Sequence, residues 1–262
     1  MFTHHFGMKT LPFREHPPLD AILSDDRFER ARARLDHFRE HGRVALLCGR
    51  TGVGKTTLVR SFLAAADARH YFPLFLKTSR LGASALLRLM VVGMGERPAR
   101  GRERHFSQLI EKASSLSKAV LLVVDDAHLV DPVSLHDLRL LSDTTGNDNK
   151  PLFRVLLSGQ EDLQLLFRQE RFADLNDRMN IRVLLSSLSE AEAQDYIQRQ
   201  LKKSGASTAI IPQEIARMIH HHCAGVPRRI NNAATNCLLT AAAEKLKIID
   251  EACASRALEE IP

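Results

Sequence analysis

The sequence is poor in several kinds of residue that build large cores. It contains no tryptophan, and aromatic residues make up only 5% of its 262 positions. The core must therefore rely on Leu, Ile, Val and Ala side chains. A chain of this length can bury enough of them to fold without disulfide bonds or structural metals.

Cysteines and long apolar runs are also scarce. No two cysteines form a CxxC pair, which excludes a disulfide framework and fits a reducing compartment. No run approaches the ~18 apolar residues of a membrane span. The first residues lack the apolar centre of a signal peptide. We therefore expect a cytoplasmic protein with no membrane partner. The cysteines are Cys48, Cys223, Cys237 and Cys253.

The charge is weakly basic. The chain has 37 Lys and Arg against 31 Asp and Glu, a formal net charge of +6. Such a balance favours an anionic partner, either nucleic acid or a membrane surface. Composition alone does not choose between a polyanionic partner and none.

Strand and helix patterns alternate through the first 188 residues. Apolar runs at 43–48, 119–124 and 153–157 predict buried strands, and 71–77 and 181–185 are weaker candidates. This alternation predicts an α/β fold with a parallel sheet covered by helices on both faces. The expected helices span 25–40, 56–66, 84–94, 105–116 and 133–142, the last with Asp131 and Pro132 as cap and first turn.

The strand pattern stops after Leu188. Ser189 and Glu192 have the spacing of a capping box, which starts a helix. Further helices are expected at 213–223, 229–246 and 251–260. We therefore predict a strand-rich domain over 1–188, with 1–40 as an N-terminal extension, and a small all-helical domain over 189–262.

One segment matches a phosphate-binding motif in full. Residues 49–57 read G-R-T-G-V-G-K-T-T, which fits G-x-x-x-x-G-K-[ST] between an apolar strand and a helix. The glycines let backbone N–H groups turn toward phosphate oxygens, and the helix start favours the same anion. Lys55 supplies a cation for the β and γ phosphates, and Thr56 a hydroxyl for Mg²⁺. The expected ATP contacts are Gly49, Thr51, Gly52, Val53, Gly54, Lys55, Thr56 and Thr57.

A second motif follows the strand at 119–124. Asp125 is placed to hold Mg²⁺ beside the phosphate loop. Asp126 is placed as the general base that polarises the attacking water. Asp is shorter than the more usual Glu, so slow hydrolysis is one consequence. Without the phosphate loop, a solvated Asp-Asp turn would explain the same residues.

Further segments resemble one family. Residues 157–163 (L-S-G-Q-E-D-L), 175–182 (L-N-D-R-M-N-I-R) and 225–231 (G-V-P-R-R-I-N), with Phe6-Gly7 and Pro12-Phe13, are similar to AAA+ ATPases of the ExeA-like (general secretion pathway A-like) group. The resemblance covers nearly the whole chain. It implies a P-loop AAA+ three-layer fold with a parallel sheet of about five strands. The base would span 1–188 and the helical lid 189–262.

The resemblance also implies roles for individual residues. Ser158 and Gln160 would sense the γ phosphate, and Arg228 would approach the nucleotide from the lid. Arg178, with Arg182 as second choice, would reach into the site of a neighbouring subunit. A trans-acting arginine stabilises charge during phosphoryl transfer, so hydrolysis would depend on a homo-oligomer, either a ring or a helical filament.

Relatives of this kind occur in two settings. Secretion ATPases are fused to a membrane span and a wall-binding domain. Standalone ATPases of the TnsC, MuB, IstB and TniB kind bind duplex DNA with ATP and recruit a DDE transposase, in some cases with a target-selection protein. Because this chain is basic and ends after the lid, we expect the transposition role. Type II secretion or pilus assembly is the alternative, and an ATP-gated signalling module with little turnover is a second one.

Two basic segments are candidates for contacts with duplex DNA. Lys77, Thr78 and Arg80 follow the second strand, where the transposition relatives face DNA. The segment 97–104 has four arginines without aromatic residues, so it would bind phosphate and not bases, although a solvated loop explains it equally well. The contacts expected outside the first segment are Arg100, Arg102 and Lys150.

Consecutive histidines at 220–222 do not predict a metal site. Neighbouring positions on a helix point in different directions, whereas metal ligands must converge.

Overall fold

The computed structural model describes residues 2–15, 17–78 and 82–261. The chain divides into two compact units. The sheet unit comprises residues 27–49 and 55–185, and the helical unit comprises the residues up to 26, 50–54 and those from 186 onward. The domain boundary expected at residue 188 stays a prediction. The compact units differ from it mainly because residues up to 26 and 50–54 are grouped with the helices.

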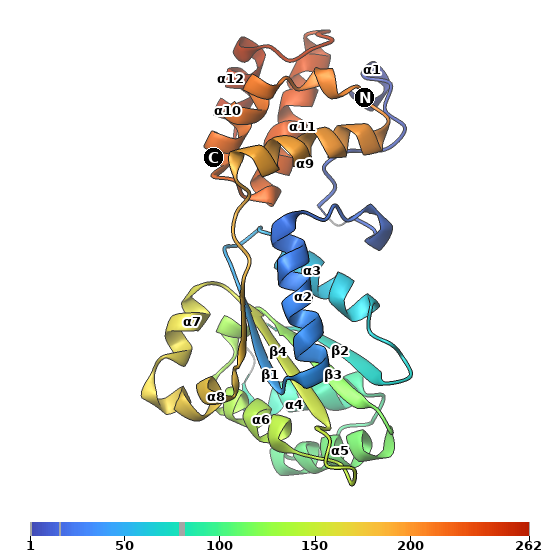
Figure 1. Cartoon of the computed structure of the whole chain (residues 1–262), viewed down its shortest axis with the longest axis vertical. Helices are drawn as coiled ribbons and strands as arrows, with labels where there is room; N and C mark the ends of the chain where they lie inside the picture. The colour runs from blue at the N-terminus through green and yellow to red at the C-terminus, as the bar shows by residue number, and fades with distance from the viewer. Residues whose placement is uncertain (1, 16, 79–81, 262) are drawn as a thin grey trace. The chain divides into compact units, whose positions relative to one another are not determined.

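The sheet unit is built on one parallel sheet. Within the described residues it has five strands in the order β2-β3-β4-β1-β5, and all neighbouring strands are parallel (Figure 1). This confirms the predicted α/β fold with about five strands. The strands are β1 Val44–Cys48, β2 Tyr71–Lys77, β3 Ala119–Asp125, β4 Phe153–Gly159 and β5 Ile181–Leu184.

Helices cover both faces of this sheet. Even-numbered side chains of β1 and β3 pack with α4, α5 and α6 in one cluster. Odd-numbered side chains of the same strands, apart from the partly buried Ala119, are also buried, on the face where α2 and α3 lie (Figure 1). The helices of this unit are α2 Asp26–His41, α3 Lys55–Ala64, α4 Ala83–Gly93, α5 Arg102–Ser115, α6 Pro132–Asp143, α7 Asp162–Phe167 and α8 Ala173–Arg178, with short 3₁₀ turns η2 Ala127–Leu129 and η3 Glu170–Phe172.

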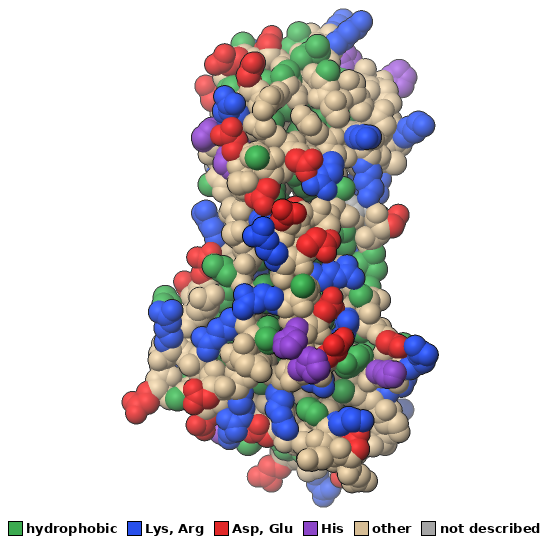
Figure 2. Space-filling model, in the orientation of Figure 1, with side chains coloured by type: hydrophobic (Ala, Val, Ile, Leu, Met, Phe, Trp, Pro, Cys, Tyr) green, Lys and Arg blue, Asp and Glu red, His purple; other side chains and the backbone are tan. Residues whose placement is uncertain are grey.

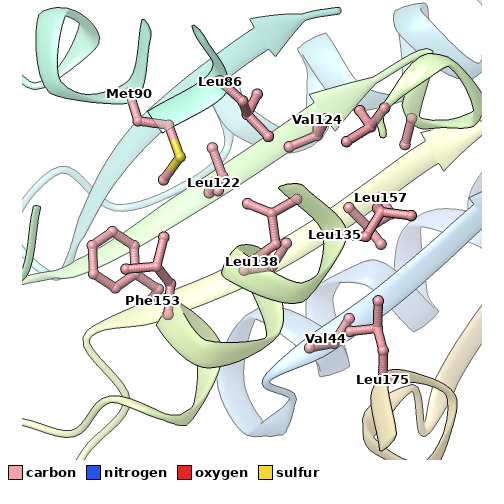
Figure 3. Close-up of a cluster of buried hydrophobic side chains, with 14 of the residues drawn as sticks. Val44, Leu86, Met90, Leu122, Val124, Leu135, Leu138, Phe153, Leu157 and Leu175 are labelled. Carbon is pink, nitrogen blue, oxygen red and sulfur yellow. The ribbon is translucent and has the colours of Figure 1, made fainter. Parts of the chain in front are cut away.

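The cluster on the α4–α6 face consists mainly of aliphatic side chains. Leu122 and Leu157 from the sheet meet Met90 from α4 and Leu138 from α6, and all four are fully buried (Figure 3). Burying each such side chain contributes about 1.5–3 kcal/mol. Of the residue types on which the core was expected to rely, Leu and Val make up most of this cluster, and Phe153 is an aromatic member.

Local signals in the sequence explain several ends and edges. Asp131 caps α6 by accepting hydrogen bonds from Val133 N and Ser134 N, as the sequence predicts. Pro73 lies in β2, which is an edge strand of the sheet. A proline is tolerated there because one side of the strand has no hydrogen-bonding neighbour.

The helical unit includes the N-terminus. Phe2 and Phe13 are buried in the same cluster as α9, α10 and α11, so the N-terminal segment is part of this core. The predicted capping box at Ser189 and Glu192 is present. Its elements are α1 Phe2–His5, η1 Leu19–Ala21, α9 Glu190–Ser204, η4 Thr208–Ile210, α10 Gln213–Cys223, α11 Pro227–Ala243 and α12 Glu251–Glu259.

All four cysteines are free and buried. Burial raises the pKa of the Cys48 and Cys223 thiols to about 11 and that of Cys237 to about 12. These thiols are therefore neutral near pH 7 and are poor nucleophiles or metal ligands.

Within the described residues, no helix combines the length and the apolar character that crossing a membrane requires.

Gly225 closes the turn between α10 and α11 against the start of α9. Its φ is +69°, and a Cβ there would lie 2.1 Å from Leu188 O. We predict that Gly225→Ala lowers the free energy of unfolding of the helical unit by about 1–2 kcal/mol from the left-handed backbone and about 1–3 kcal/mol from the clash. Gly7→Ala is the matched control, because φ is +64° with no atom of the described residues within 4 Å. If Gly225→Ala and Gly7→Ala lower the free energy of unfolding in urea by the same amount, the clash between the new Cβ at residue 225 and Leu188 O is relieved.

Candidate functional site

The phosphate loop needs glycine at two positions. Gly52 has φ of +84° and Gly54 of +108°, values that residues with a Cβ rarely adopt. In the sheet unit, the loop is flanked by Gly49 and by Lys55, where α3 begins. Lys55 is 8% exposed, and its Nζ donates to Gly49 O at 2.7 Å. The lysine is therefore folded back over the loop that it would serve.

A buried carboxylate joins three elements of the sheet unit. Asp125 ends β3 and is 1% exposed. Its Oδ2 accepts a hydrogen bond from Thr56 Oγ1 at 2.7 Å, and its Oδ1 accepts one from Ser158 Oγ at 2.8 Å. The structure thus brings together two predicted Mg²⁺ ligands that are 69 residues apart in the sequence. A hydroxyl beside a carboxylate is a hard-oxygen set, which fits Mg²⁺.

Ser158 serves this carboxylate directly. It is 0% exposed, and its hydroxyl points to Asp125. In this conformation it orients a metal ligand and does not face solvent, so its predicted contact with the γ phosphate stays a prediction. Gln160 is exposed, and its side-chain nitrogen lies 3.3 Å from His128 Nε2. Gln160 is therefore the one of the two predicted sensors that a ligand can reach.

Thr78 holds the acidic turn in place. Its N–H donates to Asp125 O at 3.0 Å, and its hydroxyl lies 2.7 Å from Asp125 O and 2.9 Å from Asp126 O. Asp126 itself has a left-handed backbone, with φ of 55° and ψ of 37°. The DNA contact of Thr78 stays a prediction, and the structure counts against it, because the side chain is 5% exposed and bonded to these carbonyls.

Both arginine-finger candidates are tied to their own subunit. Arg178 Nε donates to Asp143 Oδ1 at 2.7 Å, and its Nη1 donates to Asp174 O. The hydrogen bond with Asp143 raises the pKa of Arg178. Arg182 Nη2 donates to Asn176 Oδ1 at 2.7 Å. The structure of one subunit leaves the choice between them open.

Arg228 is held by the helical unit. Its N–H donates to Gly52 O at 3.2 Å, so the backbone of α11 meets the phosphate-loop residues grouped with this unit. Its guanidinium lies 3.4 Å from Glu15 Oε1, and both side chains are more than half exposed. Such exposed pairs contribute about 0–1 kcal/mol, so a phosphate could replace the Glu15 carboxylate. No pattern in the sequence pointed to Glu15.

The candidate DNA contacts differ in their availability. Lys77 is exposed at the end of β2, and Arg100 is exposed in the loop before α5, whereas Arg80 lies outside the described residues. Arg102 forms a two-pronged ion pair with Asp137, whose side chain is buried, and this hydrogen bonding raises the pKa of Arg102. Arg102 therefore neutralises an internal charge, which counts against its predicted DNA contact.

Lys150 has a weaker attachment. Its Nζ lies 3.0 Å from Asp148 Oδ2, and both side chains are well exposed. An exposed pair of this kind leaves the lysine largely accessible to an external anion.

The fold and this site define a P-loop AAA+ ATPase architecture. It has a parallel sheet in the order β2-β3-β4-β1-β5, a phosphate loop between β1 and α3, and a carboxylate at the end of β3. Residues 38–167 match the family model of the AAA domain. In sequence the chain is similar to general secretion pathway protein A of Aeromonas hydrophila, with 28% identity over 247 residues.

Solved structures share the fold at low sequence identity. The chain is similar to Cdc6p from Pyrobaculum aerophilum, with a TM-score of 0.77, 16% identity and coverage of 99% of this chain and 71% of that one. It is also similar to the Aeropyrum pernix ORC1 protein in complex with DNA, with a TM-score of 0.68, 16% identity and coverage of 97% and 66%.

The sequence relative is much longer than the matched region. The match covers 92% of this chain but 45% of the Aeromonas protein. The chain therefore spans less than half of that relative. The comparisons thus show similarity to the AAA domain and to general secretion pathway protein A, and the solved structures show the fold.

Thr78→Val tests the support of the acidic turn. The change keeps the side-chain shape but leaves the Asp125 and Asp126 carbonyls without this donor. We predict that the free energy of unfolding falls by about 1–3 kcal/mol and that ATP hydrolysis falls several-fold, because Asp126 loses its anchor. Thr145→Val, at an exposed position, is the control in urea unfolding and steady-state ATPase assays. A Thr78→Val protein with unchanged turnover would show that the hydroxyl does not position Asp126.

Proposed function

We propose that the chain binds and hydrolyses ATP at the phosphate loop. One observation supports this most directly: the hydrogen-bonded chain from Thr56 through Asp125 to Ser158, next to a complete phosphate-loop motif. Two polar side chains orient a carboxylate that is 1% exposed. An arrangement with this burial is difficult to explain as a solvated Asp-Asp turn.

The proposed chemistry divides among the residues of the chain. Lys55 and the loop N–H groups bind the phosphates, and Thr56 with Asp125 would hold Mg²⁺, which neutralises charge on the β and γ phosphates when bound. Asp126 accepts a proton from the attacking water or orients it. Gln160 contacts the γ phosphate. Arg228 binds the same nucleotide once the phosphate has replaced Glu15.

We further propose that Arg178 completes the site of a neighbouring subunit. Its place at the end of α8, beside the exposed Asp174, allows it to leave Asp143 for a stronger phosphate partner. Loss of a trans-acting arginine reduces turnover by roughly 10³-fold or more. ATP binding should not change, because phosphate affinity rests on Lys55.

A mixing experiment tests this arrangement. Lys55→Ala protein is expected to lose ATP binding but to retain Arg178. Arg178→Ala protein is expected to retain ATP binding but to lack the arginine. Each alone should be nearly inactive, and a mixture should regain ATPase activity, because one subunit supplies the loop and the other the arginine. Mixtures containing Arg182→Ala in place of Arg178→Ala provide the comparison. If rescue occurs only with Arg182→Ala, the finger is Arg182; if Arg178→Ala alone is fully active, the assignment to Arg178 fails.

For the cellular role, we propose an oligomeric ATPase that binds duplex DNA and regulates a DDE transposase. The basic net charge supports a polyanionic partner. The similar ORC1 protein was solved in complex with DNA. Figure 2 shows Lys and Arg interspersed with Asp and Glu on the face that it draws, without one extended basic field. On this face, a DNA contact would therefore be local.

The exposed candidates lie at opposite edges of the sheet. Lys77 is the last residue of β2, whereas Lys150 precedes the first residue of β4. In a parallel sheet, the positions where strands end and the positions where strands begin lie at opposite edges. α5, which follows Arg100, lies at the end of the sheet unit where the strands begin (Figure 1). We propose Lys77 as the DNA contact, because the next residue is Thr78, which anchors Asp125 and Asp126. DNA at this edge would act on the turn that hydrolyses ATP.

Salt titrations separate the two edges. We predict that Lys77→Ala weakens ATP-dependent binding to duplex DNA at every sequence and lowers the slope of log K against log salt by about 0.9, the loss of one phosphate contact. The double variant Arg100→Ala, Lys150→Ala should keep the parent slope. The reverse result in fluorescence-anisotropy titrations would move the DNA surface to the other edge of the sheet.

The alternative is an ATPase of type II secretion or pilus assembly. The observation that favours it is the 28% identity to general secretion pathway protein A over 92% of this chain. Electron microscopy of the protein with duplex DNA and a non-hydrolysable ATP analogue discriminates the two roles. DNA-coated rings or filaments support transposition. ATPase activity without DNA binding at any salt concentration supports secretion.

A further inference from the structure

Two helices of the helical unit bring potential metal ligands together. Glu190 begins α9, and His220 and His221 lie near the end of α10. One ligand atom of each residue lies within 4.8 Å of the other two. The two imidazole rings are edge to face, with centroids 5.5 Å apart. Consecutive histidines diverge around a helix, but here the Glu190 carboxylate from another helix lies 3.5 Å from His221 Nε2 and within 4.8 Å of a ring nitrogen of His220.

A backbone carbonyl orients the His220 ring in the way that hydrogen-bond partners orient metal-bound histidines. His220 Nε2 lies 3.0 Å from Leu188 O and donates to this carbonyl in the matching tautomer. The lone pair is then on Nδ1, which is buried and has no hydrogen-bond partner among the described residues. A buried lone pair without a donor is unfavourable, and a metal ion would satisfy it. A backbone carbonyl that accepts the second N–H is the usual partner of a metal-bound histidine.

The carboxylate is oriented in a similar way. Arg217 Nε donates to Glu190 Oε1 at 2.9 Å, which leaves Oε2 facing His221 Nε2 at 3.5 Å. Arg217 therefore occupies one carboxylate oxygen and fixes the other. Its positive charge disfavours a cation nearby, so only an ion with strong affinity for imidazole nitrogen is expected to bind.

We propose that Glu190, His220 and His221 form a site for a divalent transition metal of the Zn²⁺ class. Two imidazoles and one carboxylate suit Zn²⁺, Co²⁺ or Ni²⁺, whereas Mg²⁺ prefers oxygen ligands alone. Three protein ligands leave a position for water. This site is distinct from the Mg²⁺ pair Thr56 and Asp125, which belongs to the sheet unit.

The site lies next to the turn that leads to Arg228. Leu188 N donates to Gly225 O at 2.8 Å, and Gly225 follows α10 directly. A metal bound to Glu190 and α10 would clamp the start of α9 to this turn. Metal binding would therefore stabilise the helical unit and hold the beginning of α11 in place.

Calorimetric titration of the full, tag-free chain with ZnCl₂ after chelator treatment tests the proposal. One Zn²⁺ should bind per chain, and MgCl₂ should give no signal at this site. His221→Ala and Glu190→Gln should each weaken Zn²⁺ binding by at least about 10–100-fold. Zn²⁺ should also raise the thermal unfolding midpoint of the parent chain, and this increase should be absent in both variants.

Matched substitutions control for other metal-binding groups. His136→Ala removes an exposed helical histidine of the sheet unit, and Glu214→Gln removes an exposed carboxylate from the first turn of α10. Both should bind Zn²⁺ as the parent does. If His221→Ala and Glu190→Gln fold normally by circular dichroism and still bind Zn²⁺ with parental affinity, the proposal is overturned. Equal binding of Mg²⁺ at this site would also overturn it, because it would indicate a carboxylate-only contact.

Discussion

The buried carboxylate of Asp125 organises the sheet unit around the phosphate loop. At 1% exposure, an ionised side chain requires hydrogen-bond donors, and Thr56 and Ser158 supply them from the start of α3 and from β4. The parallel register brings these elements together at one edge, since Leu47 of β1 pairs with Ser158 of β4. The same two hydrogen bonds that compensate for burying the carboxylate also orient its two oxygens and the Thr56 hydroxyl. Stability and the proposed catalysis therefore depend on one group.

Thr78 extends this organisation to the edge strand. Lys77 of β2 pairs with Asp125 of β3, and Thr78 then bonds the carbonyls on both sides of the turn. The left-handed backbone of Asp126 is held at this point, where an unsupported residue would relax. A movement of the segment after β2 would thus reach Asp126 through one side chain. This contact gives the proposed DNA edge a direct physical route to the hydrolytic residue.

The sequence predicted what depends on local pattern and not what depends on distant pairing. Apolar runs located all five strands, and the Asp131 cap and the Ser189–Glu192 capping box are set by neighbouring residues. Strand order brings Asp125 to Thr56, and the shared motif anticipated that result. The burial of Thr78, the pairing of Arg102 with Asp137 and the approach of Glu190 to His220 and His221 involve partners 30 to 48 residues apart in the sequence. No periodicity in the sequence indicates such pairs, so the burial of Thr78 could not be predicted.

These pairings also change how the charge of the chain should be interpreted. Arg102 compensates a buried carboxylate, Arg178 is bonded to Asp143, and Arg228 is paired with Glu15. These pairs already cancel within the formal charge of +6, so it is the count of 37 Lys and Arg residues that overstates the cations an external anion meets. The pairs differ in how readily the arginine can leave its carboxylate for another anion. An exposed partner such as Glu15 is displaced at little cost. Removing Arg102, in contrast, would leave the Asp137 carboxylate buried without its partner. By this criterion the proposed exchange for phosphate is easiest for Arg228, is less easy for Arg178, whose partner Asp143 is 34% exposed, and is excluded for Arg102. Burial of the acidic partner, more than the number of arginines, decides which of them are available to nucleotide or DNA.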